Sequence, residues 1–100
     1  MKLALWQGVS PLSDIDDAVD QAERALRAAA ALDASVLVLP ELWLPGYNQP
    51  DMAKKSLTRD SAPLARLADA ARATGCALVT GYAERDGACL YNSAIAFGPQ

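Results

Sequence analysis

Val36-Leu37-Val38-Leu39-Pro40 is the stretch that decides the fold of this chain. The four residues before the proline are all apolar, which is typical of a strand that is buried on both faces of a parallel sheet. Pro40 has no backbone N–H to donate, so it ends the strand. The stretch therefore predicts a central strand of an α/β fold, with helices in the segments that connect it to its neighbours.

An amphipathic helix over residues 14–32 is predicted before this strand. Its apolar residues recur with the helical period of 3.6, so that one stripe of the helix faces a core. Ser13 followed by Asp16 resembles a capping box at the start of the helix. A short apolar strand over residues 3–7 is predicted before the helix. The helical stripe consists of Ile15, Val19, Ala22, Leu26 and Ala29.

A long connection over residues 41–61 follows the central strand. Pro45-Gly46 indicates a turn inside it, and a short helix is predicted over residues 51–57. A loop of this length without regular structure is uncommon in a compact domain and is often functional. The next helix is predicted over residues 63–74, since proline suits the first turn of a helix and glycine suits its end.

Two strands are predicted at the end of the chain, over residues 77–84 and 90–97. Residues 85–88 join them, and Asp86-Gly87 is a strong signal for a hairpin turn. The predicted order is therefore β-α-β-α-β-β. Because each helix crosses over between parallel strands, we expect a mixed, mostly parallel sheet in which only the last strand is antiparallel.

Length and composition exclude several classes of protein. One hundred residues suit one small domain or part of a larger one, and 52% hydrophobic with 21% charged residues is typical of a folded chain. The net charge is −3, and Lys54-Lys55 is the only pair of adjacent basic residues, so no nucleic-acid or anionic membrane partner is predicted. No apolar run approaches the ~20 residues of a membrane helix, and no signal peptide is recognisable. We expect a cytoplasmic protein without a membrane partner.

The residue types that carry catalysis are few. There is no histidine, which removes Ser-His-Asp and Cys-His catalysis and most zinc sites from this stretch. Two cysteines, Cys76 and Cys89, do not make a disulfide framework. No metal and no cofactor are predicted.

Glu41 is the first candidate for a functional residue. In open α/β sheets, ligands bind beyond the carboxyl ends of the parallel strands, and Glu41 is the first polar residue after such a strand. A carboxylate that the long loop shields in part from water is suited to the work of a general base. The alternative from position alone is a solvated glutamate at the rim of the sheet.

The sequence of this region resembles that of a known protein family. Leu39-Pro40-Glu41-Leu42-Trp43-Leu44-Pro45-Gly46-Tyr47 resembles the first catalytic motif of the nitrilase, or carbon–nitrogen hydrolase, superfamily. The resemblance extends along the chain, and we identify residues 1–100 as the N-terminal part of a single domain of that superfamily. Further matching segments are Leu3–Gln7, residues 13–32, Gly81-Tyr82-Ala83-Glu84 and Leu90-Tyr91-Asn92-Ser93-Ala94.

The resemblance implies a Glu-Lys-Cys triad that hydrolyses an amide, a carbamoyl amide or a nitrile. The cysteine attacks the carbon, the glutamate acts as general base and the lysine stabilises the oxyanion. Glu41 takes the place of the glutamate. The lysine and the nucleophilic cysteine of the family follow later than residue 100, and Lys54 and Lys55 lie in the wrong segment. Cys76 and Cys89 are expected to be structural, with Cys76 pointing into the core.

The resemblance also implies the N-terminal portion of a four-layer α-β-β-α sandwich, often assembled into homo-oligomers. Alone, the 100 residues lack a second sheet, so we expect them to aggregate and to be inactive. Within this family, we expect the activity of an amidase rather than that of a true nitrilase. The substrate is expected to be a small-molecule amide or nitrile.

Trp43 and Tyr47 flank Glu41 and are candidates for walls of a substrate pocket. The alternative is that they pack the long loop onto the rim of the sheet. Asn92 is expected to be structural. Two other hypotheses apply to the whole chain. The first is a truncated or non-catalytic α/β module that binds a ligand or partner, and the second is a nucleotide-binding unit. The second lacks a glycine-rich turn, because only Gln7-Gly8-Val9-Ser10 follows the first strand.

Overall fold

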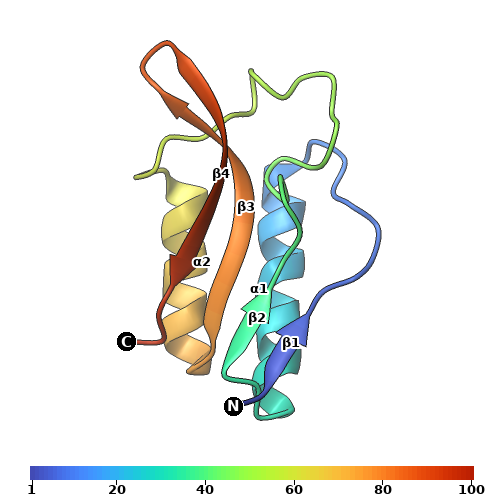
Figure 1. Cartoon of the computed structure of the whole chain (residues 1–100), viewed down its shortest axis with the longest axis vertical. Coiled ribbons are helices and arrows are strands. Elements are labelled where there is room, and N and C mark those ends of the chain that lie inside the picture. The colour runs from blue at the N-terminus through green and yellow to red at the C-terminus, as the bar shows by residue number, and fades with distance from the viewer.

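The computed structural model describes residues 1–100 and contains one sheet with two helices (Figure 1). Neighbouring strands pair in the order β1-β2-β3-β4, parallel except for the antiparallel pair β3–β4. The predicted order β-α-β-α-β-β is thereby confirmed. The elements are β1 (Leu3–Leu5), α1 (Ile15–Ala31), β2 (Val36–Val38), α2 (Ala62–Thr74), β3 (Ala77–Asp86) and β4 (Cys89–Phe97).

Both helices lie against the same face of the sheet (Figure 1). Side chains alternate between the two faces of each strand, so Leu37 and Leu78 point toward the helices and are buried. The other face carries a row of apolar residues at one level of all four strands. This row, which we call the open-face row, consists of Leu5, Val38, Val79 and Ala96, which are partners in the strand register.

The open face corrects the expectation that the central strand is buried on both sides. Val36 and Val38 are only half-buried, because the helices cover one face and nothing in this chain covers the other. The first strand is also shorter than predicted and ends at Leu5. Trp6 continues its hydrogen-bond pattern with one bond from its backbone N–H to the carbonyl of Val38, at 3.0 Å.

The start of α1 corrects the predicted capping box. Asp14, not Ser13, is the N-cap, and its carboxylate accepts a hydrogen bond from the backbone N–H of Asp17 at 3.0 Å. Ser13 lies outside the helix with a φ of 62°, and its hydroxyl donates to the carboxylate of Asp51 at 2.5 Å. The hydroxyl thus ties the helix entrance to the long connection instead of capping the helix.

Helix α2 forms where the sequence predicts it. It begins at Ala62 with Pro63 in its first turn, and it ends at Gly75, which has a φ of 68°. This left-handed conformation costs glycine little because it has no Cβ. Leu64 and Leu67 are fully buried against the sheet and α1.

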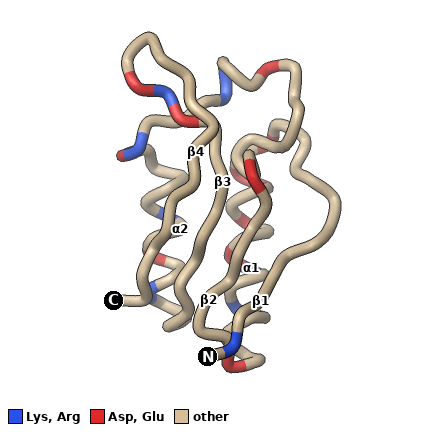
Figure 2. Tube along the Cα trace, in the orientation of Figure 1, with Lys and Arg blue, Asp and Glu red and all other residues tan.

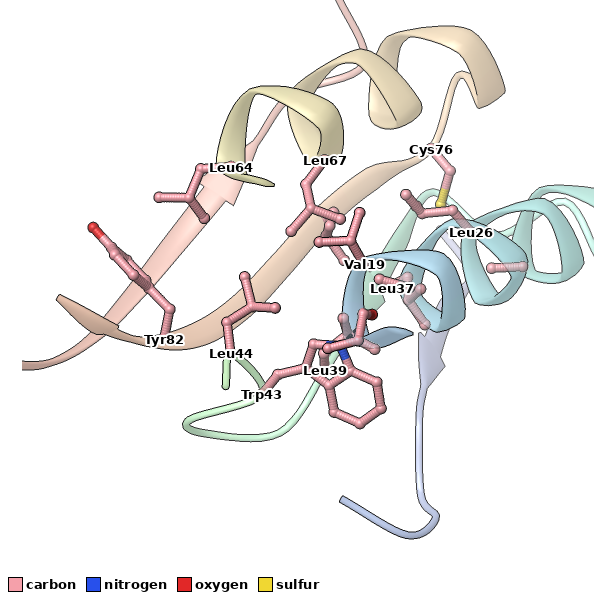
Figure 3. Close-up of a cluster of buried hydrophobic side chains, with 14 of the residues drawn as sticks. Val19, Leu26, Leu37, Leu39, Trp43, Leu44, Leu64, Leu67, Cys76 and Tyr82 are labelled. Carbon is pink, nitrogen blue, oxygen red and sulfur yellow. Dashed lines mark hydrogen bonds between the residues drawn. The ribbon is translucent and has the colours of Figure 1, made fainter. Parts of the chain in front are cut away.

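The core lies between the helices and the sheet (Figure 3). Val19 and Leu26 of α1 meet Leu67 of α2 over the strands, and all three are fully buried. Cys76 also points into this core, as predicted. Burying a leucine or valine side chain stabilises the fold by about 1.5–3 kcal/mol, so this layer holds the helices on the sheet.

The connection over residues 41–61 differs from the prediction, because no helix forms over residues 51–57. Two backbone hydrogen bonds close turns there, one from Lys55 to the carbonyl of Asp51 at 3.1 Å and one from Ser56 to the carbonyl of Ala53 at 3.4 Å. Leu57 instead pairs with the upper part of β3, since its N–H donates to Ala83 at 2.8 Å. This pairing fixes the far end of the connection to the sheet.

Charged residues avoid the body of the sheet (Figure 2). The strands β1, β2 and β4 have no Lys, Arg, Asp or Glu, and β3 has them only at its end, in Glu84-Arg85-Asp86. Neither helix is long and apolar enough to cross a membrane.

Candidate active site

The chain beyond β2 continues along the edge of β3. The N–H of Leu39 donates to Val79 at 2.8 Å, and the N–H of Ala83 donates to Leu44 at 2.8 Å. Between these two bonds the loop turns outward, with Leu42 at a φ of 52°. Glu41 lies in this turn, at the carboxyl end of β2, where ligands bind in open α/β sheets.

The backbone of this turn packs directly against Gly81 in β3. A Cβ built at Gly81 would lie 2.5 Å from the backbone nitrogen of Leu42 and 2.6 Å from the Cα of Glu41. Only glycine allows this approach, because real Cβ atoms do not come so close to backbone atoms. The glycine of the Gly-Tyr-Ala-Glu segment therefore sets the position of Glu41.

The carboxylate of Glu41 contacts one side chain from another strand. Nδ2 of Asn92, in β4, donates to Oε2 of Glu41 at 2.9 Å. Glu41 itself is exposed, so the shielding expected from the long loop is absent in this chain. The contact joins the end of β2 to β4 across the intervening β3.

A hollow of about 420 Å³ opens beside Glu41 on the uncovered face of the sheet. Four of its lining residues are apolar, and the lining also includes the Glu41 carboxylate and the Asn92 amide. A carboxylate held at the edge of an apolar hollow is suited to taking a proton from a bound group. The residues that line the hollow are Val38, Leu39, Glu41, Val79, Thr80, Gly81, Asn92, Ser93 and Ala94.

Trp43 is not brought to this hollow. Its ring is 1% exposed in the core beneath the helices, and its Nε1 donates to the carbonyl of Ala18 at 3.0 Å (Figure 3). Its ring meets that of Trp6 edge to face, with centroids 5.8 Å apart. These contacts place Trp43 in the core, on the side of the sheet that the helices cover.

Tyr47 is also outside the hollow. Its side chain is 56% exposed, while its backbone N–H donates to the hydroxyl of Ser10 at 2.8 Å. The preceding Gly46 has a φ of 138°, and a Cβ there would lie 1.9 Å from the carbonyl oxygen of Pro11. The Pro-Gly-Tyr segment therefore packs the loop against the segment before α1.

The model of the family named "Carbon-nitrogen hydrolase" matches residues 2–100. The chain belongs to this family. It is 35% identical to a nitrilase of Pyrococcus abyssi over 106 residues, which cover 100% of this chain and 40% of that protein. It is also 35% identical to a nitrilase of Pseudomonas syringae, over 91% of this chain and 31% of that protein.

Solved structures of the carbon–nitrogen hydrolase family share its fold. An amidase of Nesterenkonia sp. AN1 from the nitrilase superfamily is 28% identical, with a TM-score of 0.87 over 99% of this chain and 39% of that one. A variant of that amidase, with a glutamate changed to glutamine, carries acrylamide on its active site cysteine. It is 27% identical, with a TM-score of 0.86 over 99% of this chain and 40% of that one. The chain thus spans 31–40% of the length of the relatives named here.

The cysteines and lysines of this carbon–nitrogen hydrolase chain lie away from the hollow. Cys76 is fully buried at the start of β3, and burial raises the pKa of its thiol, which opposes formation of a nucleophilic thiolate. Cys89 is exposed beside the hairpin turn. Lys54 and Lys55 belong to the long connection. The lining of the hollow therefore includes the Glu41 carboxylate but no cysteine or lysine.

The contact between Asn92 and Glu41 is the feature of the site that was not predicted from the sequence. Asn92 belongs to the Tyr-Asn-Ser segment that resembles the family, but the sequence does not reveal that its amide reaches Glu41. The register supplies that information, because Asn92 pairs with Ala83, two residues beyond Gly81. No three Cys, Asp or Glu side chains lie close enough together to hold a metal ion.

Proposed function

We propose that this chain supplies the general base of an enzyme that hydrolyses a carbon–nitrogen bond in a small amide, carbamoyl amide or nitrile. Family membership supports the reaction class. The observation that carries the residue assignment is the Glu41 carboxylate, oriented by Asn92 at the edge of an apolar hollow.

In the proposed reaction, Glu41 takes the proton of a cysteine thiol while the sulfur bonds to the substrate carbon. A lysine stabilises the negative charge that develops on the substrate oxygen of an amide, or nitrogen of a nitrile. With an amide, the proton passes to the nitrogen, and ammonia or an amine leaves as the carbon–nitrogen bond breaks. With a nitrile, the proton passes to the nitrogen to give a thioimidate, which adds water and then loses ammonia to reach the same thioester. Water, activated by the same carboxylate, then cleaves the thioester and releases the acid.

The cysteine and lysine are proposed to come from sequence outside residues 1–100. The burial of Cys76 and the position of Cys89 beside the hairpin support this, as does the absence of a lysine at the hollow. On this proposal, residues 1–100 are the N-terminal part of a single domain with a four-layer α-β-β-α sandwich. The half-buried, apolar open face is consistent with a second sheet packing there. A homo-oligomeric, cytoplasmic enzyme stays the prediction of the sequence.

The proposal is tested by measuring ammonia release from short amides, carbamoyl amides and nitriles, using the longer polypeptide that carries residues 1–100. We expect turnover of at least one class, with the acid as product. Both amides and nitriles belong in the panel, since the relatives include enzymes named nitrilase and amidase. Saturable binding of these compounds without turnover would contradict the proposal and favour a non-catalytic binding module.

A further inference from the structure

We propose that Asn92 is a positioning residue for the general base: its amide holds one oxygen of the Glu41 carboxylate and leaves the other free to take the proton. This inference rests on the proposed function of Glu41. Nδ2 of Asn92 donates to Oε2 at 2.9 Å, and no other side chain bonds to this carboxylate. Oε1 is therefore the oxygen available for proton transfer.

The backbone positions of both partners are fixed independently of their contact. Glu41 is held by the close approach of its turn to Gly81, whose N–H also donates to the carbonyl of Pro40 at 3.3 Å. Asn92 lies in the middle of β4, paired with Ala83 of β3. What remains free in the absence of their contact is the rotation of the Glu41 side chain, which is exposed.

The amide of asparagine is chemically suited to this task. It donates a directional hydrogen bond but carries no charge, so it orients the carboxylate without forming an ion pair that opposes protonation. A misplaced catalytic group loses rate steeply with distance, so orientation of the carboxylate should act on kcat.

A merely structural role for Asn92 is disfavoured by its surroundings. Its side chain is exposed on the uncovered face of the sheet and does not belong to the core. Gln21 offers a matched comparison. The Gln21 amide also donates to a carboxylate, that of Asp17, at 2.7 Å, but both residues lie on α1, away from the hollow.

The test compares four variants of the longer polypeptide: Asn92→Ala, Asn92→Asp, Gln21→Ala as control, and Glu41→Gln as reference. We expect Asn92→Ala to lower kcat about 10- to 100-fold, with KM and the melting temperature close to those of the control. Asn92→Asp keeps the shape of the side chain but replaces the donor by a second carboxylate. Its kcat should fall at least as far.

Three outcomes would overturn the inference. These are unchanged kcat in both Asn92 variants, retained kcat in Asn92→Asp alone, which indicates a packing role, and a loss of activity that parallels a loss of stability. The Glu41→Gln reference separates these outcomes from failure of the proposed function. If that variant keeps its activity, the assignment of the base itself is wrong.

Discussion

Gly81 has no side chain, and at the scale of single residues this determines where Glu41 lies. The Gly81→Ala substitution would place a Cβ within 2.6 Å of two backbone atoms of the loop. Because backbone atoms cannot yield as a flexible side chain does, we predict a loss of about 1–3 kcal/mol in the free energy of unfolding. We also predict a large loss of kcat as Glu41 is displaced. Urea unfolding and steady-state kinetics measure the two effects.

The matched control for this prediction is Gly98→Ala, since a Cβ there meets nothing within 4 Å. That variant should match the wild type in both measurements. If Gly81→Ala also matches it, the loop does not depend on the close approach at Gly81.

Cys76 is predicted to make stability depend on alkaline pH. Burial raises the pKa of its thiol above the ordinary 9.0 in the folded state. The unfolded state therefore loses its proton first as the pH rises, so the stabilising contribution is complete below pH 9.0 and is lost above it. The midpoint of urea unfolding should fall above pH 9.0, and fall less in Cys76→Ala. If the urea midpoint falls equally in both proteins, the effect belongs to other groups. One such group is Tyr82, because burial also raises its pKa.

At the scale of elements, the N-cap of α1 has a measurable role. Asp14 accepts a hydrogen bond from Asp17 and satisfies a backbone N–H that has no partner within the helix. Asp14→Ala should therefore lower the free energy of unfolding by about 1 kcal/mol, whereas Asp14→Asn, which caps equally well, should retain most of it. Thermal or urea unfolding distinguishes the two, and equal losses would show that the cap contributes nothing specific.

The elements also show what the sequence reveals and what it does not. Helix α2 was predictable because its signals are local: Pro63 at its start, Gly75 at its end and an apolar stripe between them. The absence of a helix over residues 51–57 was not, because Leu57 pairs with β3, a contact distant in sequence. For the same reason the sequence indicated Glu41 through its motif but not the role of Asn92, which depends on the register of β3 and β4.

Trp43 illustrates the same limit at the site. Its proximity to Glu41 in sequence suggests a substrate contact, but the turn at Leu42 directs the two side chains to opposite sides of the sheet. Motif spacing places residues in one segment, whereas backbone geometry decides which face of the sheet each side chain reaches.

At the scale of the whole molecule, the uncovered face of the sheet dominates. Leu5 of the open-face row is 62% exposed and lies on a sheet face without charged residues in β1 or β2 (Figure 2). We predict that residues 1–100 alone associate through this face, as measured by sedimentation and light scattering. We also expect them to be inactive, and turnover of an amide by this segment would show that no further residues are needed.

The matched pair for association is Leu5→Lys and Leu32→Lys. Both leucines are exposed, at 62% and 65%, but Leu32 caps the end of α1 and lies off the sheet. Leu5→Lys should weaken association of the segment, whereas Leu32→Lys should leave it unchanged. Equal effects would show that association does not use the open face.

The most direct test of the central claim is the kcat/KM of Glu41→Gln in the longer polypeptide, compared with Glu23→Gln on α1. Glutamine preserves the shape of the side chain but cannot take up the proton. We predict a loss of about 10²- to 10⁴-fold in Glu41→Gln, the usual contribution of a general base, with an unchanged melting temperature. Glu23, which pairs with Arg66 at 2.8 Å on the far side of the molecule, should tolerate the change. A Glu41→Gln enzyme with near-normal kcat/KM would contradict the assignment of Glu41 as the base.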